Sequence, residues 1–382
     1  MIRKPRLFTP GPTQPLPQAQ AAEAAARLHH HSRQYSALLK EVRAGLKYFF
    51  NTRNDVVVLT SSGTGAMEAA VVNTVEPGDD VLVLNAGRFG ARWSAICHAF
   101  GARVKELTVP PGRAPDPGDV KKALGKKYRA MFMQGVETST GTLMPVREIA
   151  AIAKRSGCLV VVDAITMLGA HEVRPDDWGL DITLGASQKA LAMAPGLAFA
   201  CISPDALARM RAIKTPRFYF DLVREHDAQA ALKTTFTPAL SLMAGCDASL
   251  KWLRETSLEA LIGNAALLSG MTRAAMNAAG LKLFSKSPAH SVTAVEAPPQ
   301  IDVRKFSEKI ENRFGALIGK GQDSLSDRIF RVSHLGYCDY IETIGLIGAI
   351  ENALGDLGAK VSTGKALAAA QQFFRGHIGD AP

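Results

Sequence analysis

The stretch DVVVLTSSGTGAMEAA, residues 55–70, decides the fold class of this chain. Its first part is an apolar, β-branched run, which is typical of a strand covered on both faces of a parallel sheet. Small residues follow at 61–65, and a helical pattern begins at Thr64. Free N–H groups and the dipole at such a helix start favour an anion. The stretch therefore predicts an α/β fold with a phosphate site, although a tight turn with a Ser/Thr cap fits the same residues.

From this stretch onward, short β-branched runs, several of them continuously apolar, alternate with helical patterns. The runs predicted as strands are 55–60, 80–86, 103–109, 130–134, 158–163, 181–185 and 197–203. Helical patterns separate most of them, at 64–75, 91–100, 117–124 and 146–156. This alternation predicts a mostly parallel sheet of seven strands. Only a short loop at 195–196 separates the last two runs, which favours an antiparallel pair and hence a mixed sheet.

A second, smaller α/β unit is predicted after a long helix over 241–278. Its expected elements are extended segments at 281–287 and 291–297, helices at 303–318 and 340–354, a strand at 329–334, and an Ala-rich helix with a frayed tail from 363. Five prolines in the first 17 residues predict an extended arm without helix. We therefore expect an N-terminal arm of residues 1–20, a large domain of residues 21–262 and a small C-terminal domain of residues 263–382.

Length, charge and cysteine content limit the class of protein. The chain has 382 residues, which is enough for two domains. Its net charge of +10 favours nucleic acid, an acidic ligand or a phosphate-bearing cofactor as a partner. The alternative is a basic surface with no specific role. The positive charges are scattered, so we expect no nucleic-acid partner. No apolar run reaches ~18 residues and no signal peptide is evident, so we expect no membrane partner. Five widely spaced cysteines indicate a reducing compartment, the cytoplasm, and no metal cluster.

Two further residues carry candidate chemistry. Asp163 ends the run VVVD at the carboxyl edge of the predicted sheet, where α/β proteins bind ligands, although a helix cap or turn is the alternative. Lys189 lies among small and apolar residues in GASQKAL. Burial and a cationic neighbour would lower the pKa of this lysine and leave a reactive neutral amine. The alternative is that its side chain extends to the surface and keeps its charge in water. A phosphate turn, a strand-end carboxylate and a lysine 26 residues later match the needs of pyridoxal phosphate.

The motifs of the chain, taken in order, resemble those of a known family. They are FTPGPT (8–13), SSGTGAMEAAVVN (61–73), GRFG (87–90), ETSTG (137–141), VVDAIT (161–166), SQKAL (187–191), FTPALSL (236–242) and FRVSHLG (330–336). They resemble the class-V, fold-type I pyridoxal-phosphate aminotransferases, in the branch of the alanine–glyoxylate, serine–glyoxylate and serine–pyruvate aminotransferases. The resemblance implies a large domain with a mostly parallel, seven-stranded mixed sheet and a smaller C-terminal α/β domain.

The resemblance also implies roles for residues around the cofactor. Lys189 would bind the cofactor covalently and act as the catalytic base, and Asp163 would pair with the ring nitrogen. Phe89 would lie over one face of the ring, where the family often has Trp, and Ile165 over the other. Thr138 would lie near the phenolic oxygen. The phosphate would be bound by Ser62, Gly63, Thr64 and Gln188.

Other motifs imply a substrate site and a second subunit. Arg331 matches the family arginine that binds the substrate carboxylate, and a planar bidentate fork suits that role. The region of Gly11 would help to close the substrate site. Thr235 and Thr237 resemble the segment that reaches the phosphate of a neighbouring subunit, and which of the two makes that contact stays open. We therefore expect a homodimer with shared active sites.

The implied activity is a ping-pong transamination between amino acid and 2-oxo acid substrates. Serine or alanine would give its amino group to glyoxylate or pyruvate. Aspartate, ureidoglycine or 2-aminoethylphosphonate as donor is the alternative within the fold, and a non-catalytic pyridoxal-phosphate-binding subunit is the alternative outside it. We interpret His29, His30 and His31 as structural rather than as a metal site. Cys338 is interpreted as a packed or surface thiol rather than the nucleophile of a desulfurase.

Overall fold

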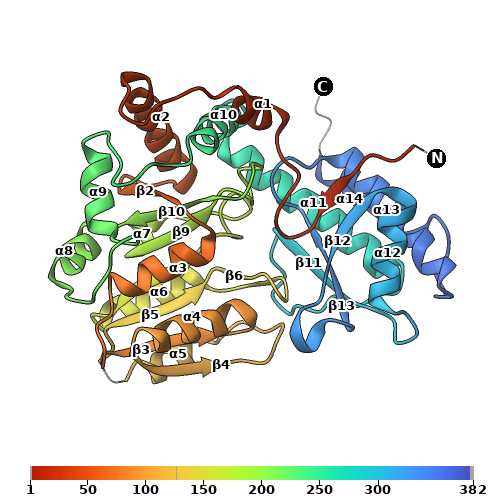
Figure 1. The fold of residues 1–382 in the computed structure, drawn as a ribbon. Helices are drawn as coiled ribbons and strands as arrows, with labels where there is room; N and C mark the ends of the chain where they lie inside the picture. The colour runs from red at the N-terminus through yellow and green to blue at the C-terminus, as the bar shows by residue number, and fades with distance from the viewer. Residues whose placement is uncertain (1, 126, 379–382) are drawn as a thin grey trace.

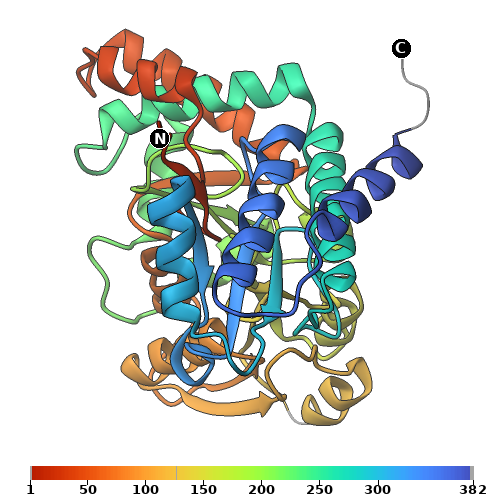
Figure 2. The same cartoon turned by 90° about the vertical axis from the view of Figure 1, so that its right-hand side faces the viewer.

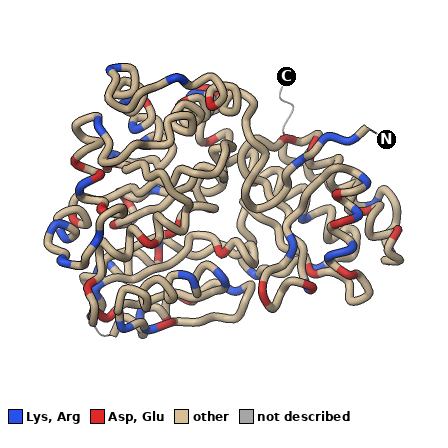
Figure 3. Tube along the Cα trace, viewed as in Figure 1, with Lys and Arg blue, Asp and Glu red and all other residues tan. Residues whose placement is uncertain are grey.

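A computed structural model describes residues 2–125 and 127–378 of the chain. It contains two units side by side, each with its own sheet (Figure 1). In that view Lys and Arg are interspersed with Asp and Glu over both units (Figure 3). Every helix within the described ranges is too short or too polar to cross a membrane.

The larger unit is built on a mixed sheet of seven strands in the order β2-β10-β9-β8-β5-β3-β4. Only β10 runs antiparallel to its neighbours, β2 and β9. Each strand lies within one residue of a run predicted from the sequence, and the antiparallel pair is confirmed. The strands are β2 (Asp55–Thr60), β3 (Asp80–Asn85), β4 (Arg103–Thr108), β5 (Ala130–Gln134), β8 (Leu159–Asp163), β9 (Ile182–Ala186) and β10 (Leu197–Ile202).

Helices cover both faces of this sheet, which explains the continuous apolar runs of its strands. Side chains of one strand alternate between the faces. In β8, Val160 and Val162 belong to the core beneath α2 (Arg33–Phe50), α6 (Val146–Arg155) and α10 (Leu240–Thr256). Val161 faces the opposite core, beneath α3 (Gly63–Val72), α4 (Arg88–Ala99) and α8 (Pro204–Ala212). The remaining elements of this unit are α5 (Pro117–Ala123), α7 (Pro175–Trp178), α9 (Leu222–Ala230) and the hairpin β6 (Val136–Glu137) and β7 (Thr142–Leu143).

The smaller unit has a four-stranded sheet in the order β1-β12-β13-β11 (Figure 2). Its first strand comes from the N-terminal arm and pairs parallel with β12. The strands are β1 (Arg6–Phe8), β11 (Val292–Glu296), β12 (Ala316–Lys320) and β13 (Ile329–Ser333). The associated helices are α11 (Leu258–Ala278), α12 (Val303–Phe314), α13 (Tyr340–Asp356) and α14 (Lys365–His377), and a 3-10 turn, η1 (Asp323–Leu325), precedes β13.

Two predictions for the smaller unit are wrong. The segment 281–287 is not a strand, because only Leu283 makes an isolated bridge, to Val295. The helix expected to reach residue 318 ends at Phe314, and Gly315 follows with φ of 72°, a left-handed conformation that ends helices. The next five residues form β12 instead.

Two helix predictions near the predicted boundaries are also wrong. The arm of residues 1–20 was expected to lack helix, but α1 (Pro17–Ala25) begins inside it. A proline at the first helical position loses no hydrogen bond, since that N–H has no partner in a helix. The expected helix 241–278 is broken at Ser257, whose φ is 76° and whose hydroxyl caps α11. Residue 263 lies inside α11, and the boundary between residues 262 and 263 stays a prediction.

Candidate active site

One cavity at the carboxyl edge of the large sheet collects most of the predicted cofactor residues. It has a volume of about 120 Å³. Residues from the β2–α3 turn, from the ends of β8 and β9 and from α4 reach it, which is the place where α/β sheets bind ligands. The nine predicted residues in its lining are Ser62, Gly63, Thr64, Phe89, Thr138, Asp163, Ile165, Gln188 and Lys189, and they are joined by Met67, Arg92 and Thr166.

The start of α3 provides the anion-binding end of the cavity. The Ser62 hydroxyl accepts the Gly65 N–H at 3.4 Å, so Ser62 is the N-cap. A Cβ on Gly63 would lie 2.5 Å from the end of the Ile165 side chain, so a larger residue here would displace Ile165. The Gln188 side-chain oxygen is buried and has no hydrogen-bond partner among the described residues.

Arg92 adds a positive charge to the same end of the cavity. Its guanidinium donates to the Thr64 hydroxyl at 2.9 Å and lies 4.7 Å from the centre of the Phe89 ring. Arg92 therefore contacts both the predicted phosphate turn and the predicted stacking ring. Sequence reasoning missed this residue, although a residue three positions after Phe89 on a helix lies on the same face.

Asp163 is held at the end of β8 with one carboxylate oxygen in a backbone hydrogen bond. The Ile165 N–H donates to it at 2.9 Å. Burial raises the pKa of Asp163 to about 6, while the Ile165 hydrogen bond and the charge of Lys189 act in the opposite direction. A protonated ring nitrogen beside this carboxylate would stabilise its charged form further.

Lys189 follows β9 and lies against the N-terminal arm. Its ammonium donates to the carbonyl oxygen of Pro10, and a Cβ on Gly11 would lie 2.2 Å from its Nζ. The Thr13 hydroxyl donates to the Lys189 carbonyl oxygen at 2.8 Å. Burial lowers the pKa of Lys189 to about 8; Asp163 opposes this shift, and Arg331 and Arg92 add to it. A lysine with this pKa has a usable fraction of neutral amine near neutral pH.

A buried carboxylate fixes the backbone beneath the Phe89 ring. Glu137 accepts the N–H groups of Phe89 and Gly90 at 3.1 and 3.2 Å, and the side-chain amide of Gln134 at 3.0 Å. Burial raises the pKa of Glu137, and hydrogen bonds from Ser139, Gly90 and Phe89 oppose the shift. Glu137 begins the ETSTG motif, and no role for it is predicted from the sequence.

Arg331 lies beneath Thr138 with part of its hydrogen-bonding capacity free. Its Nη1 donates to the Thr138 carbonyl at 2.9 Å, and its Nε and Nη2 donate to the Lys320 carbonyl at 3.0 and 2.7 Å. A guanidinium has five N–H donors. One N–H on each terminal nitrogen is therefore left without a partner among the described residues, which is the arrangement that binds a carboxylate as a fork. Burial lowers the pKa of Arg331 to about 10, so it stays charged at neutral pH.

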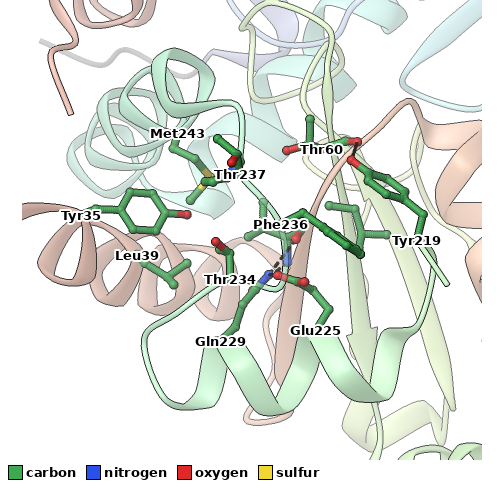
Figure 4. A pocket seen from close by; sticks show the side chains of 13 residues that line it. Tyr35, Leu39, Thr60, Tyr219, Glu225, Gln229, Thr234, Phe236, Thr237 and Met243 are labelled. Atoms are coloured by element: carbon green, nitrogen blue, oxygen red, sulfur yellow. Dashed lines mark hydrogen bonds between the residues drawn. The ribbon is translucent and has the colours of Figure 1, made fainter. Parts of the chain in front are cut away.

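Thr235 and Thr237 lie outside this cavity in the single chain. Thr237 lines a separate pocket together with Tyr35, Phe236 and Met243 (Figure 4). The backbone N–H of Thr235 donates to Glu225, and its hydroxyl is buried without a partner within the described part of the chain. Their predicted contact with the phosphate of another subunit stays a prediction.

The other two motifs noted in the sequence lie away from the cavity. His29, His30 and His31 lie between α1 and α2, and the rings of His30 and His31 are 4.0 Å apart. Cys338 is half-buried, and burial raises the pKa of its thiol to about 12, which disfavours the thiolate.

The cavity brings together an amine with a lowered pKa, a strand-end carboxylate and the N-terminus of a helix. This combination fits a pyridoxal-phosphate-dependent transferase. The chain belongs to the class-V aminotransferase family, whose model matches residues 14–334. Proteins of this family, and the related solved structures, depend on pyridoxal phosphate. The family, the fold, the enzyme class and the cofactor predicted from the sequence are thereby confirmed.

Similar proteins carry several names. The chain is 36% identical to the soluble hydrogenase 42 kDa subunit of Anabaena cylindrica, over 98% of this chain and 100% of that protein. It is 29% identical to the serine–glyoxylate aminotransferase of Methylorubrum extorquens, over 97% of this chain and 96% of that one. The solved structure of an aspartate aminotransferase of subgroup IV from Thermus thermophilus superposes with a TM-score of 0.86 at 33% identity, over 92% of this chain and 99% of that chain.

Proposed function

We propose that the protein transfers the amino group of serine or alanine to glyoxylate or pyruvate by a ping-pong mechanism. The observation that carries the proposal is the pair of unpartnered N–H groups on buried Arg331, a residue whose charge also acts on the pKa of Lys189. A carboxylate fits that fork better than a phosphonate does, which favours amino acids over aminophosphonates as donors. The serine–glyoxylate relative supports the choice of a small donor.

Each residue has a task that follows from its surroundings. Bound pyridoxal phosphate would carry the amino group and delocalise negative charge from the substrate carbon. Ser62, Gly63, Thr64 and Gln188 would hold its phosphate at the start of α3, and Phe89 and Ile165 would lie on the two faces of its ring, with Thr138 beside its phenolic oxygen. Asp163 would accept a hydrogen bond from its ring nitrogen and keep that nitrogen protonated.

Lys189 and Arg331 would act on the substrate. Arg331 would bind the α-carboxylate and thereby set the direction of the α C–H bond. Lys189 Nζ would take the α-proton and return it during the second half of the reaction. Its lowered pKa of about 8 supports this role, because a general base works best when its pKa lies near the working pH. Gly11 supports the same arrangement, since it leaves room for Nζ beside the arm.

A half-reaction screen tests the proposed donors and acceptors. Each amino acid is added to the holoenzyme, and loss of the visible cofactor absorbance reports amino transfer; a 2-oxo acid is then added to restore the absorbance. We expect serine and alanine to bleach the absorbance and glyoxylate and pyruvate to restore it. With the Lys189→Ala variant we expect neither change. The proposal is wrong if serine and alanine leave the absorbance unchanged.

We further propose a homodimer in which Thr235 or Thr237 completes the site of the neighbouring subunit. Phe218 and Tyr219 support such an interface, because they are 72% and 48% exposed and their rings lie within 6 Å of the Phe236 ring, at 5.6 and 5.1 Å. The unpartnered hydroxyl of Thr235 also supports it. Large exposed aromatic side chains of this kind are enriched at protein interfaces.

Subunit mixing tests the shared site. Lys189→Ala subunits are mixed with subunits that carry Thr235→Val and Thr237→Val. A hybrid dimer then has one site with intact residues from both chains, so we expect activity above that of either parent. The matched control replaces the threonine variant by Thr64→Val, whose defect lies in the same chain as Lys189 and is not rescued. Equal behaviour of the two mixtures, or a fully active monomer in sedimentation, would exclude a shared site.

The compartment that we propose is the cytoplasm. All five cysteines are free, and four of them are buried. Free thiols in this number support a reducing environment.

A further inference from the structure

Arg92 is a cation in the cavity lining to which the proposed function gives no task. Of the described residues that line the cavity, Arg92, Lys189 and Asp163 carry a charge. Lys189 would bind the cofactor covalently, and Asp163 would pair with its ring nitrogen. Arg92 reaches the same cavity from α4 and is only partly exposed, so it is not an arginine of the open surface.

The predicted phosphate site has hydrogen-bond donors but no full positive charge. Its residues Ser62, Gly63, Thr64 and Gln188 are uncharged, and they offer backbone N–H groups, hydroxyls and a side-chain amide. A phosphate ester carries about 1.5 to 2 negative charges at pH 7, whereas the start of a helix supplies about half a positive charge. A cation at the start of α3 would therefore favour binding of the doubly charged phosphate.

The Arg92 guanidinium lies at the start of α3. Its Nη1 donates to the Thr64 hydroxyl oxygen at 2.9 Å, and Thr64 is the second residue of α3. A hydroxyl has one proton to donate and two lone pairs that accept. Because Arg92 occupies one lone pair, the Thr64 proton remains for donation to an anion. The hydrogen bond thus prepares Thr64 as a donor and holds a positive charge directly behind it.

Neutral groups hold this guanidinium in place. Besides the Thr64 hydroxyl, the Phe89 ring contacts it, with the guanidinium carbon 4.7 Å from the ring centre, within the ~6 Å range of a cation–π interaction. Arg88, on the same helix, is instead paired with the carboxylate of Asp323. Within residues 2–125 and 127–378, Arg92 forms no ion pair, so its charge is available to a bound anion.

The charge of Arg92 also acts across the cavity. Burial is the main cause of the lowered pKa of Lys189, and the charge of Arg92 adds to this lowering. At Asp163, where burial raises the pKa, the charge of Arg92 opposes the shift. The electrostatic effect of this guanidinium therefore extends into the space that the cofactor would occupy.

We propose that Arg92 is a positioning residue that supplies the positive charge for the phosphate of pyridoxal phosphate, acting through the Thr64 hydroxyl, while Phe89 holds its guanidinium in place. This inference rests on the proposed function, which places the phosphate at the start of α3, and it adds the cation that the predicted phosphate residues lack. Arg92 then determines how tightly the cofactor is retained and not which amino donor reacts.

Two aldehydes that differ only in the phosphate test this role. Pyridoxal phosphate and pyridoxal are titrated separately into the apo chain, and the ratio of their dissociation constants is compared between variants. We expect Arg92→Gln to weaken the binding of pyridoxal phosphate by about 10- to 100-fold more than that of pyridoxal, the range for loss of a charged hydrogen bond. Effects of Arg92 on Phe89, Asp163 or Lys189 are common to both aldehydes and cancel in the ratio.

Two further variants separate the charge from the structure. Arg92→Lys keeps a positive charge, so we expect it to retain most of the preference for pyridoxal phosphate. Arg103→Gln is the matched control, because it removes the same charge at the opposite edge of the sheet, where Arg103 begins β4 and pairs with Asp80 at 3.1 Å. We expect this control to leave the ratio unchanged.

Three outcomes of the titrations would contradict the inference. Arg92→Gln could weaken both aldehydes by the same factor, which would limit Arg92 to the packing of the Phe89 ring, or it could weaken neither. Arg92→Lys could lose as much as Arg92→Gln, which would show that the charge does not bind the phosphate. Arg103→Gln could change the ratio as much as Arg92→Gln, which would make the effect one of net charge alone.

The phosphorus NMR signal of the bound cofactor gives a second readout, which a packing role would not move. A nearby positive charge stabilises the dianion and lowers the second pKa of the phosphate, which is about 6 in a free ester. We expect the titration midpoint to lie about 1 pH unit or more higher in Arg92→Gln than in the wild type. Equal midpoints would overturn the inference. Neither measurement requires amino transfer, so failure of serine and alanine as donors would refute the proposed function and leave the role of Arg92 still decided.

Discussion

The carboxylate of Glu137 accepts hydrogen bonds from the backbone N–H groups of Phe89 and Gly90, at 3.1 and 3.2 Å. These two N–H groups belong to the first turn of α4, where a helix offers no internal acceptor. A carboxylate at this position is favoured by the helix dipole. Glu137 therefore holds the backbone from which the Phe89 ring projects into the cavity, although it does not line the cavity itself.

Glu137→Gln should loosen the cofactor site through this backbone. The amide keeps the shape of the side chain but turns a donor toward N–H groups that need an acceptor, at a cost of about 1–3 kcal/mol. We expect a lower melting temperature of the apo chain and weaker binding of pyridoxal phosphate, measured by thermal unfolding and by titration. Glu308→Gln is the control, because Glu308 lies on α12 in the smaller unit and its exposed carboxylate pairs only with Arg304 among the described residues. Unchanged cofactor affinity in Glu137→Gln would mean that Phe89 does not depend on this carboxylate.

Gly11→Ala should interfere directly with Lys189. Gly11 has φ of +137°, and a Cβ there would lie 2.2 Å from Lys189 Nζ. We expect covalent attachment of pyridoxal phosphate, measured after borohydride reduction, to weaken by about tenfold or more, a change of about 1.4 kcal/mol. Gly157→Ala is the matched control, because Gly157 also has positive φ but its Cβ would meet nothing within 4 Å. Equal cofactor binding by the two variants would exclude the contact as the cause.

The seven strands of the large sheet could be predicted because their pattern is local. All but β4 are short apolar runs, and burial on both faces leaves little room in them for polar positions. The edge strand β4, RVKELT, carries three charged residues and is mostly exposed. Asp163 and Lys189 could be found for a related reason, since Asp163 ends β8 and Lys189 lies shortly after β9, and the carboxyl ends of these strands share one edge of the sheet. The roles of Phe89, Ile165, Thr138 and Gln188 were implied only by the resemblance to the family.

The elements that were missed depend on distant partners. The strand β12 pairs with β1, so Arg6 lies opposite Ala316, and no local pattern connects residues so far apart. The helix start at Pro17 is compatible with the proline-rich sequence but is not demanded by it. Glu137 contacts the start of α4, and Arg92 contacts the β2–α3 turn. Both contacts join segments that are distant in the sequence, so neither role is visible in the motif that contains the residue.

The uptake of pyridoxal phosphate by the apo chain should depend on pH through Lys189. Only the neutral amine attacks an aldehyde, and the pKa of Lys189 is lowered to about 8. We therefore expect the capture rate to rise about tenfold per pH unit below pH 8 and to level off above it. Lys189→Ala serves as the blank for non-covalent binding.

Two variants should move this midpoint in opposite directions. The Asp163 carboxylate raises the pKa of Lys189, so Asp163→Asn should shift the midpoint to lower pH. The Arg92 guanidinium lowers that pKa, so Arg92→Gln should shift the midpoint to higher pH. A change in rate without a change in midpoint would mean that these charges do not act on Lys189.

Arg331→Lys should damage substrate binding more than the fold. Arg331 donates hydrogen bonds to the carbonyls of Thr138 and Lys320. Lysine is chosen as the replacement because it keeps a positive charge and a donor, whereas an apolar residue would leave both buried carbonyls unpaired. Lysine replaces these hydrogen bonds only in part, and we expect a decrease in melting temperature of a few degrees, about 1 kcal/mol for a chain of this kind. An ammonium cannot form the bidentate fork. The kcat/KM for alanine and for serine should therefore fall about 10- to 100-fold, as for a lost charged hydrogen bond.

A substrate without the carboxylate distinguishes this loss from a general disturbance of the site. Ethylamine lacks the group that Arg331 would bind, so its slow reaction should change little in Arg331→Lys. If Arg331 binds the carboxylate, the effects on kcat/KM of changing the arginine and of removing the carboxylate are not additive. The wild type then prefers alanine over ethylamine strongly, and the variant prefers it much less. A variant that loses both amines in proportion would place Arg331 in the packing of Thr138 and Lys320 alone. A variant that keeps the alanine preference of the wild type would show that the α-carboxylate binds elsewhere in the cavity.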